Sequence, residues 1–405
     1  MRFHFHPLAI SRMSVALTTA TLVLAWVSLC GAQPATEGRS SAAKPFSEQA
    51  TKNSKDVLTP QQWQQVDATV DRGLEFLAKQ QQQDGSFETL PIGQPGVTSL
   101  CVMAYLSRGH MPDQGPYGKR IASAINFVLD CQQADGLLCD MKVVRPAWVK
   151  NTPAHTAVYN HVISALMLTE VYGMTAGEQS QRIRKAIPKA LAFSLRYEDK
   201  IPKRPGDQGG YRYVRPLIRT STSDVSVTAW QLMFFRSARN AEFDVPNERI
   251  DAAVNYIARC FSTRHRLFVY GLHGSNPRRP PSRGIQGAAI VSLSMGGKHG
   301  TKMAQQAGTW VIAQTFDEYN RSRSYKDRYH YSAYYCSQAM FQLGGEYWAK
   351  FYPRLMQTLA ANQRRDGSWD PESVDGDGRW GSTYTTALSV LALAPAYQIL
   401  PIYQR

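Results

Sequence analysis

Two kinds of helical pattern alternate along the chain after residue 60. In the first kind, apolar residues recur three and four positions apart, as at Val70, Leu74 and Leu77, which is typical of an amphipathic helix. In the second kind nearly every residue is apolar or small, which indicates a helix buried on most sides. The second kind comprises residues 98–106, 161–173, 227–238, 287–297, 334–345 and 385–394. Strand-like alternation is scarce, so the pattern predicts an all-α fold.

A polar motif ends the amphipathic segments. It reads "KQQQQDGSF" at residues 79–87, "CQQADGLL" at 131–138 and "NQRRDGSWD" at 362–370. Asp-Gly ends a helix because Gly reaches left-handed conformations at little cost and Asp accepts local hydrogen bonds. Three weaker copies keep only the preceding helix, at residues 189–198, 252–261 and 306–315. Six copies at a loose period indicate a repeat array rather than two unrelated domains.

The three full copies follow one order, which is a small residue, an aromatic, an aliphatic, a Gln, a Gly and a large apolar residue, although Leu355 and Thr358 replace the small and aromatic residues in the last copy. This order resembles the Gln-Trp repeat of the squalene cyclase and protein prenyltransferase superfamily, over roughly residues 60–396. The resemblance implies an (α/α)6 toroid, a double-layered α-barrel of six helical hairpins with the apolar helices inside. In that family the Gln ties one outer helix to its neighbour and the aromatic packs against it. The resemblance therefore implies structural roles for Gln81, Gln132, Gln363, Phe87 and Trp369.

The first 59 residues differ from the rest. Arg2 and Arg12 precede an apolar stretch at 14–29 and small residues before Gln33, which predicts a signal peptide over 1–33 and export to the periplasm or medium. The alternative is an uncleaved membrane anchor. Residues 34–59 are rich in Ser, Ala, Lys and Gln, which is typical of a flexible linker. The toroid is expected over 60–405.

The chain is basic, with 46 Lys and Arg against 31 Asp and Glu. A basic chain can bind nucleic acid, but the export signal argues against that partner, and none is predicted. The charge instead indicates solvated faces, or attraction to an anionic membrane surface or polysaccharide. Cys131 and Cys139 are close enough in sequence to form a local disulfide; the alternative is that all the cysteines after the signal are small buried residues.

Candidate chemistry centres on Asp224. Cyclases of this superfamily that protonate squalene carry Asp-x-Asp-Asp-Thr-Ala, and "DVSVTA" at 224–229 matches that frame with Ser226 and Val227 at the missing acids. An alkene is protonated only by a strong acid sharpened by polar neighbours, so squalene cyclisation is not expected. Asp224 remains the candidate catalytic acid, and a helix N-cap is the alternative.

Other catalytic patterns are incomplete. "DRYHYSAYYC" at 327–336 is similar to the His segment of the prenyltransferase zinc site, but the Asp-x-Cys partner is missing, so no metal and no cofactor are predicted. No Cys precedes Glu-Gln as a thioester would require. Toroidal glycosidases and lyases use two carboxylates, or a Tyr or His base beside Arg. Glu170, Asp207, Asp224 and Asp327 are acids of interest, but sequence places no two of them across one cleft.

Residues at the starts of the inner helices are expected to line one mouth of the ring. Together with Asp224 the set is His155, Tyr159, His161, Thr228, Arg283, Gln286, His330, Tyr331, Tyr334, Trp380 and Tyr384. Aromatic residues with a few His, Arg and Asp suit an apolar or amphiphilic small molecule, or a stacked sugar. Long segments at 140–153, 202–222 and 273–283 are expected to carry ligand or partner contacts, "GDQGGYRY" (206–213) and "GSNPRRPPSRG" (274–284) above all.

The sequence therefore predicts an exported toroid whose central cavity binds an apolar or polymeric ligand, without the complete Asp-rich protonation motif. The alternative is a divergent terpenoid cyclase or a polysaccharide-active enzyme with relocated acids.

Overall fold

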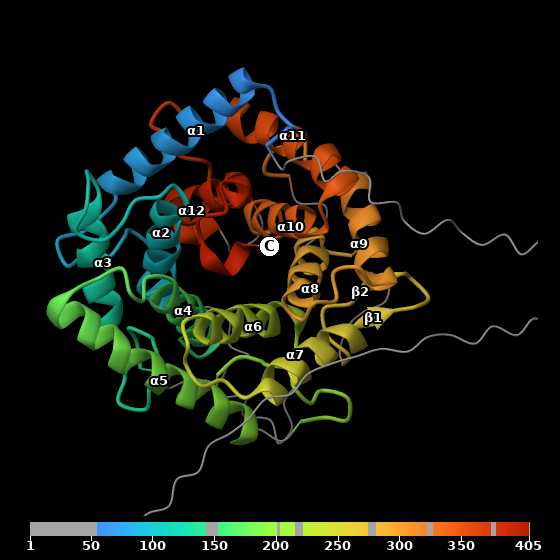
Figure 1. The fold of residues 1–405 in the computed structure, drawn as a ribbon, viewed down its shortest axis with the longest axis horizontal. Helices are drawn as coiled ribbons and strands as arrows, with labels where there is room; N and C mark the ends of the chain where they lie inside the picture. The colour runs from blue at the N-terminus through green and yellow to red at the C-terminus, as the bar shows by residue number, and fades with distance from the viewer. Residues whose placement is uncertain are drawn as a thin grey trace, which may run out of the picture. The chain divides into compact units, whose positions relative to one another are not determined.

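The computed structural model describes residues 55–142, 153–200, 203–214, 222–273, 281–314, 316–321, 327–373 and 378–404. Residues 50–405 form one compact unit. Its helices alternate between an outer and an inner ring (Figure 1). The predicted signal peptide and nearly all of the predicted linker lie outside the described residues. The first helix begins at Pro60, where Thr59 caps it by accepting a hydrogen bond from Gln62 N–H.

The outer ring consists of α1 (Pro60–Lys79), α3 (Gly118–Asp130), α5 (Gly177–Lys200), α7 (Asn247–Arg259), α9 (Lys302–Ala313) and α11 (Gly345–Ala361). The inner ring consists of α2 (Gly96–Ser107), α4 (Pro153–Glu170), α6 (Val225–Asn240), α8 (Arg283–Met295), α10 (Tyr329–Leu343) and α12 (Gly381–Leu393). The rings close where α12 packs against α2 and α11 packs against α1. The predicted all-α toroid is confirmed.

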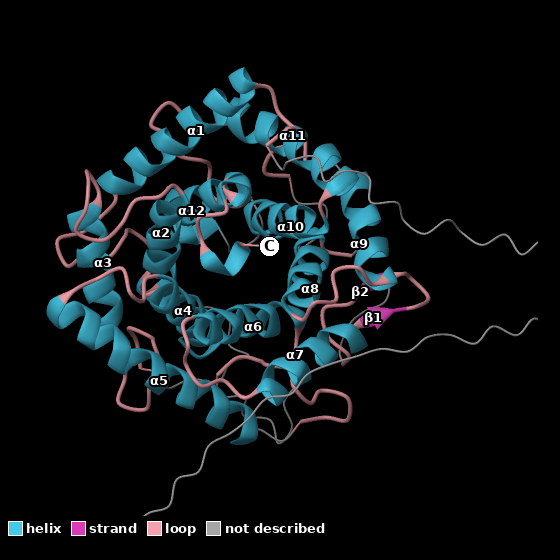
Figure 2. Ribbon diagram, viewed as in Figure 1, coloured by secondary structure: helices cyan, strands magenta, loops and turns pink. Residues whose placement is uncertain are grey.

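Little else is regular in the described residues. The strands β1 (Phe261–Ser262) and β2 (Leu267–Phe268) form an antiparallel hairpin after α7, as Figure 2 shows. Short 3-10 helices stand at η1 (Pro91–Gly93), η2 (Gly378–Trp380), η3 (Pro395–Tyr397) and η4 (Pro401–Tyr403). The inner helices begin earlier than predicted. The largest difference is in α4, where Pro at the first position starts the helix well before His161.

Three glutamines join neighbouring outer helices. Each lies in a turn that we call a clasp, which consists of the Gln, the Gly four residues later and the large apolar residue two positions after that Gly. Gln81 Nε2 donates to Gly85 O at 3.1 Å and to Arg120 O of α3 at 2.8 Å. Gln132 Nε2 likewise donates to Ala186 O of α5 at 2.9 Å. Gln363 Nε2 donates to Gly367 O and to Thr69 O of α1, both at 2.9 Å, and so closes the outer ring.

The clasp glycines are required by both conformation and space. Gly367 has a φ of +91°, and a Cβ there would lie 2.2 Å from Arg72 O of α1. The same clash would occur at Gly85, Gly136 and Gly209, each against a backbone carbonyl of the next outer helix. Gly209 reveals a fourth clasp, in which Glu198 stands at the Gln position and accepts from Gly209 N–H at 3.1 Å and from Arg249 Nη1 at 2.9 Å.

Inner-helix side chains accept the backbone N–H of the large residue of each clasp, and that of Phe268 in β2. The donors and acceptors are Phe87 to Thr98, Leu138 to His161, Tyr211 to Thr228, Phe268 to Gln286 and Trp369 to Thr386, at 2.8 to 3.2 Å. A buried N–H without an acceptor costs about 1–3 kcal/mol, so these contacts hold the two layers in register.

Aromatic side chains occupy the ring axis between α6 and α10. Trp230 of α6 stacks on Tyr334 of α10 with ring centroids 5.4 Å apart, and Tyr335 meets both rings. Figure 1 shows α6 and α10 separated by α8, so this contact crosses the inner ring. Tyr403 of η4 extends the cluster, and its hydroxyl meets that of Tyr334. These four aromatic side chains therefore form a packed cluster between α6, α10 and η4.

The C-terminal segment closes the end of the ring at which the inner helices finish. Leu400, Ile402 and Tyr403 are buried there, and Figure 1 places the C-terminus inside the inner ring. A pocket between this segment and the last turns of α2, α10 and α12 is lined by Ser107, Gln338, Leu391, Ala394, Pro395, Gln398, Ile399, Leu400 and Tyr403. We call this end the C-terminal mouth and the opposite end the N-terminal mouth.

Two buried carboxyl groups hold backbone segments in place, one near the C-terminus and one at the start of α10. Glu170, the last residue of α4, accepts from Ile402 N–H at 3.2 Å and from the Ser237 hydroxyl. Glu372 accepts from the first three N–H groups of α10, at 2.8 to 3.1 Å. Burial raises the pKa of each carboxyl to about 7.

All five cysteines after the predicted signal are buried free thiols. Cys139 Sγ contacts Met141 O at 3.3 Å, and Cys139 N–H donates to Cys131 O at 3.2 Å, so the two cysteines flank a clasp without forming a bridge. Among the helices of the described residues, none combines the length and the apolar composition needed to cross a membrane.

The first prediction concerns the clasp glycine. Gly367→Ala and Gly173→Ala both place a side chain at a strongly positive φ, but Gly173 has no atom within 4 Å of the added Cβ. Gly173→Ala should lower the free energy of unfolding by about 1–2 kcal/mol, and Gly367→Ala by a further 1–3 kcal/mol or so because of the clash with α1. Urea denaturation of the two variants measures the difference. Equal losses of unfolding free energy in the two variants would show that contact with α1 adds nothing to the effect of Gly367→Ala.

The second prediction concerns pH. The carboxyls of Glu170 and Glu372 hold their protons to about pH 7 when folded but only to about pH 4.5 when unfolded. The native state therefore binds more protons in this window, and stability falls as pH rises from 4.5 to 7, by up to about 3 kcal/mol for each group. Urea denaturation at pH 4.5, 6 and 8 measures the slope.

Glu170→Gln isolates one of the two groups. The amide keeps an acceptor for Ile402 N–H, so the variant should match the parent chain near pH 4.5 and exceed its stability at pH 8. Glu346→Gln is the control, because Glu346 is exposed on α11 and pairs with Lys350. An unchanged slope in Glu170→Gln would contradict the assignment.

Candidate functional site

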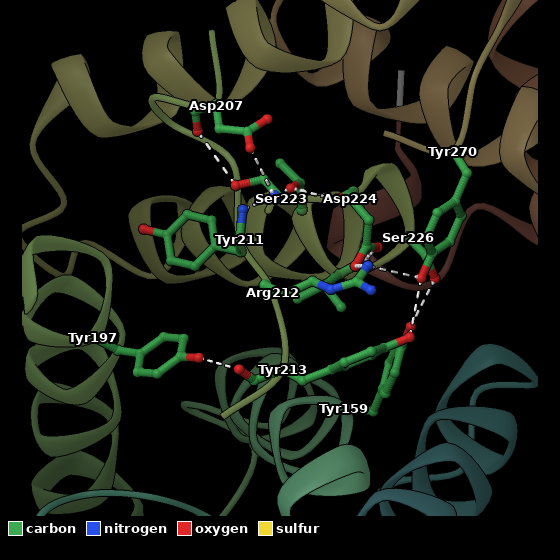
Figure 3. A network of polar contacts seen from close by, with 12 residues as sticks. Tyr159, Tyr197, Asp207, Tyr211, Arg212, Tyr213, Ser223, Asp224, Ser226 and Tyr270 are labelled. Atoms are coloured by element: carbon green, nitrogen blue, oxygen red, sulfur yellow. Dashed lines mark hydrogen bonds and ion pairs between the residues drawn. The ribbon is translucent and has the colours of Figure 1, made fainter. Parts of the chain in front are cut away.

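The N-terminal mouth collects polar and aromatic side chains from α4, α6, α10 and two connecting segments. The first turns of the inner helices meet here: Ser226, the second residue of α6, contacts Tyr331, the third residue of α10, with oxygens 2.7 Å apart. Gly284 of α8 leaves room for the Tyr331 ring, because a Cβ there would lie 2.7 Å from a ring carbon. Figure 3 shows Asp224 and Ser226 surrounded by tyrosines and by Arg212.

Asp224 is the N-cap of α6 and is completely buried. Its Oδ1 accepts from Val227 N–H at 2.8 Å, and its Oδ2 pairs with Arg212 Nη1 at 2.6 Å. Both oxygens therefore act as acceptors in contacts that suit a carboxylate. The predicted cap role is present, and this geometry offers no carboxyl O–H directed at a ligand.

Arg212 lies on the segment between α5 and α6, inside the stretch that the sequence marks for ligand contacts. Its guanidinium stacks on Tyr213 at 4.3 Å and faces Tyr270 at 5.6 Å. Nη1 also lies 3.3 Å from the Tyr270 hydroxyl. Nε and Nη2 make no hydrogen bond or ion pair with the described residues, and 24% of the side chain is exposed.

Four tyrosines line this mouth: Tyr159 of α4, Tyr213 and Tyr270, which Figure 3 labels, and Tyr331, whose hydroxyl contacts Ser226. All four are partly exposed. The Tyr159 hydroxyl donates to Ser226 Oγ at 3.2 Å, and the hydroxyls of Tyr213 and Tyr270 are 3.0 Å apart. Burial raises the pKa of all four phenols, so they stay protonated and act as hydrogen-bond donors and acceptors. His155 packs on the Tyr213 ring with centroids 4.4 Å apart.

Three residues expected at the mouth face the outer layer instead. His161, Thr228 and Gln286 accept the interlayer N–H groups described above. His161 Nδ1 is the acceptor, so Nε2 carries the proton and donates to Ser194 Oγ at 3.0 Å. Burial lowers the pKa of His161 to about 3. Ser194 in turn donates to Gln231, so this Ser–His pair has no base that could activate the serine.

Arg283 and His330 are also held in structural contacts. Arg283 pairs with Asp327 at 2.9 Å and stacks on Phe316, which joins α8 to the residues before α10. His330 Nδ1 lies 3.0 Å from Ser389 Oγ of α12, and burial lowers the pKa of His330 to about 3. Across the described residues there is no group of three or more His, Cys, Asp or Glu that could hold a metal ion.

The other residues expected at the mouth lie at different places around the ring. Tyr334 belongs to the axial aromatic cluster. Trp380 packs over Gly93, and its carbonyl accepts from the Thr89 hydroxyl, so it lies on the α2 and α12 side. Tyr384 of α12 is partly exposed. Of the sequence-predicted set, the structure therefore brings together Asp224, Tyr159, Tyr331 and His155, and adds Arg212, Tyr213 and Tyr270.

Sequence reasoning missed Tyr270 and gave Arg212 and Tyr213 no individual role. The available signal was the stretch at 206–213, where Arg stands between two tyrosines. Tyr270 follows the β-hairpin, and its carbonyl accepts from Val225 N–H at 2.8 Å, which fixes it beside Asp224. The predicted contact stretch at 274–284 lies mostly outside the described residues.

No protein-family model and no curated protein matches this sequence. Solved structures match its fold. A variant of the type II terpene cyclase MstE from Scytonema, in complex with geranylgeranyl dihydroxybenzoate, is 16% identical with a TM-score of 0.50, over 85% of this chain and 100% of that chain. A GH76 α-mannanase from Bacteroides thetaiotaomicron is 12% identical with a TM-score of 0.50, over 81% of this chain and 95% of that chain.

A possible GH105 family member from Salmonella enterica is 10% identical with a TM-score of 0.52, over 82% of this chain and 93% of that chain. At these identities the likeness is one of fold. The chain has an α/α toroid fold, which these three structures share with it.

Proposed function

We propose that this chain is an exported glycan-binding toroid that holds a polysaccharide across the N-terminal mouth. The observation that carries the proposal is the group of four partly exposed tyrosines around Ser226 and Arg212. Sugar rings stack on aromatic faces through their C–H groups, while phenol and serine hydroxyls hydrogen-bond to sugar hydroxyls. A mouth that combines both features suits a polar, ring-built ligand better than a hydrocarbon.

The axial core supports a ligand that lies across the mouth rather than inside the ring. An isoprenoid chain needs a long apolar space, but Trp230, Tyr334 and Tyr335 occupy the axis between α6 and α10. A terpenoid cyclase of the alkene-protonating type also needs a carboxylic acid with a proton to give. Asp224 has both oxygens engaged by an N–H and by Arg212.

The contacts made by the acidic residues at the helix starts favour glycan binding over glycan hydrolysis. Glycoside hydrolysis generally uses two carboxyl groups that flank the scissile bond. Asp224 pairs with Arg212, Asp327 pairs with Arg283, and Glu372 accepts three backbone N–H groups. Each of these described acids at the helix starts is thus committed to a structural contact.

The third prediction tests the aromatic mouth. Tyr213→Ala removes a ring that lies between His155 and Arg212. It should weaken polysaccharide binding about tenfold, because a buried aromatic contact in an interface is worth more than about 1 kcal/mol. Affinity electrophoresis in gels containing polygalacturonate, dextran or mannan measures the effect.

Tyr347→Ala is the matched control, because Tyr347 is also partly exposed but stands on the outer helix α11. It should leave the affinity within about twofold of the parent value. Failure of all three polysaccharides to retard the parent chain would refute binding of these glycan classes. Equal losses in both variants would place the binding surface elsewhere.

A further inference from the structure

We propose that the bound polysaccharide is acidic, and that Arg212 holds a uronate carboxylate with the edge of its guanidinium formed by Nε and Nη2. The inference rests on the proposed function and specifies its ligand. It follows from how the donors of Arg212 are used. Nη1 contacts both Asp224 and Tyr270, while Nε and Nη2 meet no described residue.

The unused edge matches a carboxylate in shape. Arginine presents two parallel N–H donors at this edge, and a carboxylate accepts both at once, which gives a stronger and more directional contact than a single charge pair. The side chain is exposed by 24%, so the edge can reach a ligand at the mouth.

The guanidinium is also fixed before any ligand arrives. Tyr213 stacks on it, Tyr270 lies on it from the opposite segment, and Asp224 anchors Nη1 at 2.6 Å. In turn, Asp224 is fixed by the N-terminus of α6 through Val227 N–H. A donor held in one orientation loses little conformational entropy on binding, so more of the contact energy contributes to affinity.

Charge at this mouth favours an anion. Arg379 of η2 stacks on Trp380 and makes no ion pair with the described residues, and Arg328 occupies the N-cap position of α10 without a side-chain capping bond.

A matched pair of polymers tests the inference. Polygalacturonate and the same polymer after carboxyl reduction differ only in that each carboxylate has become a neutral hydroxymethyl group, and isothermal titration calorimetry at about 0.15 M salt gives both affinities. The native polymer should bind at least about tenfold more tightly, since hydrogen bonds to a charged group are worth about 1.5–3 kcal/mol. Arg212→Lys, which keeps the charge but loses the fork, should weaken polygalacturonate binding about ten- to hundredfold and leave the reduced polymer unaffected.

Arg108→Lys is the matched control. Arg108 pairs with Asp71 and Asp67, faces the Tyr397 ring at 5.2 Å, and has the same exposed fraction of 24%, but it lies at the end of α2 toward the C-terminal mouth. Its substitution should change neither affinity. If Arg212→Lys fails to fold, Tyr270→Phe leaves the ion pair with Asp224 intact and should still weaken polygalacturonate binding a few-fold.

The outcomes separate the two proposals. Equal binding of native and carboxyl-reduced polymer would overturn the acidic ligand and leave glycan binding standing. Binding of neither polymer would refute both the acidic ligand and the proposed glycan binding. Equal losses in Arg212→Lys and Arg108→Lys, or dextran sulfate binding that matches polygalacturonate and vanishes at about 0.5 M salt, would show bulk charge attraction instead. An isoprenoid carboxylate that binds through Arg212 when the polymers do not would refute the glycan.

Discussion

The amide of a single glutamine, shared between two outer helices, is the contact on which the ring depends. A toroid has no covalent link between its last helix and its first, so closure must come from packing and hydrogen bonds. Gln363 supplies it by donating to its own turn at Gly367 and to Thr69 of α1. The glycine matters equally, because any side chain at that position would push α11 away from α1. Helix spacing in the outer layer is therefore set by a few backbone contacts.

The spacing of the outer helices also fixes the position of the inner helices. Each clasp delivers a backbone N–H to an inner-helix acceptor, such as Thr98 or Thr386, so the inner helix is fixed in rotation and height. Because the clasps precede the inner helices, the helix starts gather at one mouth. The segments between clasp and helix can vary without affecting closure, and the Arg212 and Tyr270 contacts arise on such segments. Architecture and ligand chemistry are therefore carried by different parts of the chain.

The same division explains what the sequence could and could not predict. The repeat was visible because helical periodicity and the Gln–Gly spacing are local features. The direction of a side chain around a buried helix is not local: in a helix apolar on most sides, no polar face shows which way His161, Thr228 and Gln286 point. Sequence placed them in a ligand cavity, and the structure bonds them to the outer layer. Arg212 could not be paired with Asp224, because the loop between them decides which cation reaches the cap.

The replacement of acids around Asp224 then has a physical consequence beyond their loss. Ser226 and Val227 leave one acid at the N-terminus of α6, where it accepts from Val227 N–H and pairs with Arg212. This contact fixes the guanidinium in place. A position that the superfamily resemblance associates with acid chemistry thus serves here to orient an arginine between two tyrosines. In the proposed function, an arginine held in that way recognises the charge and shape of a carboxylate on an anionic polymer.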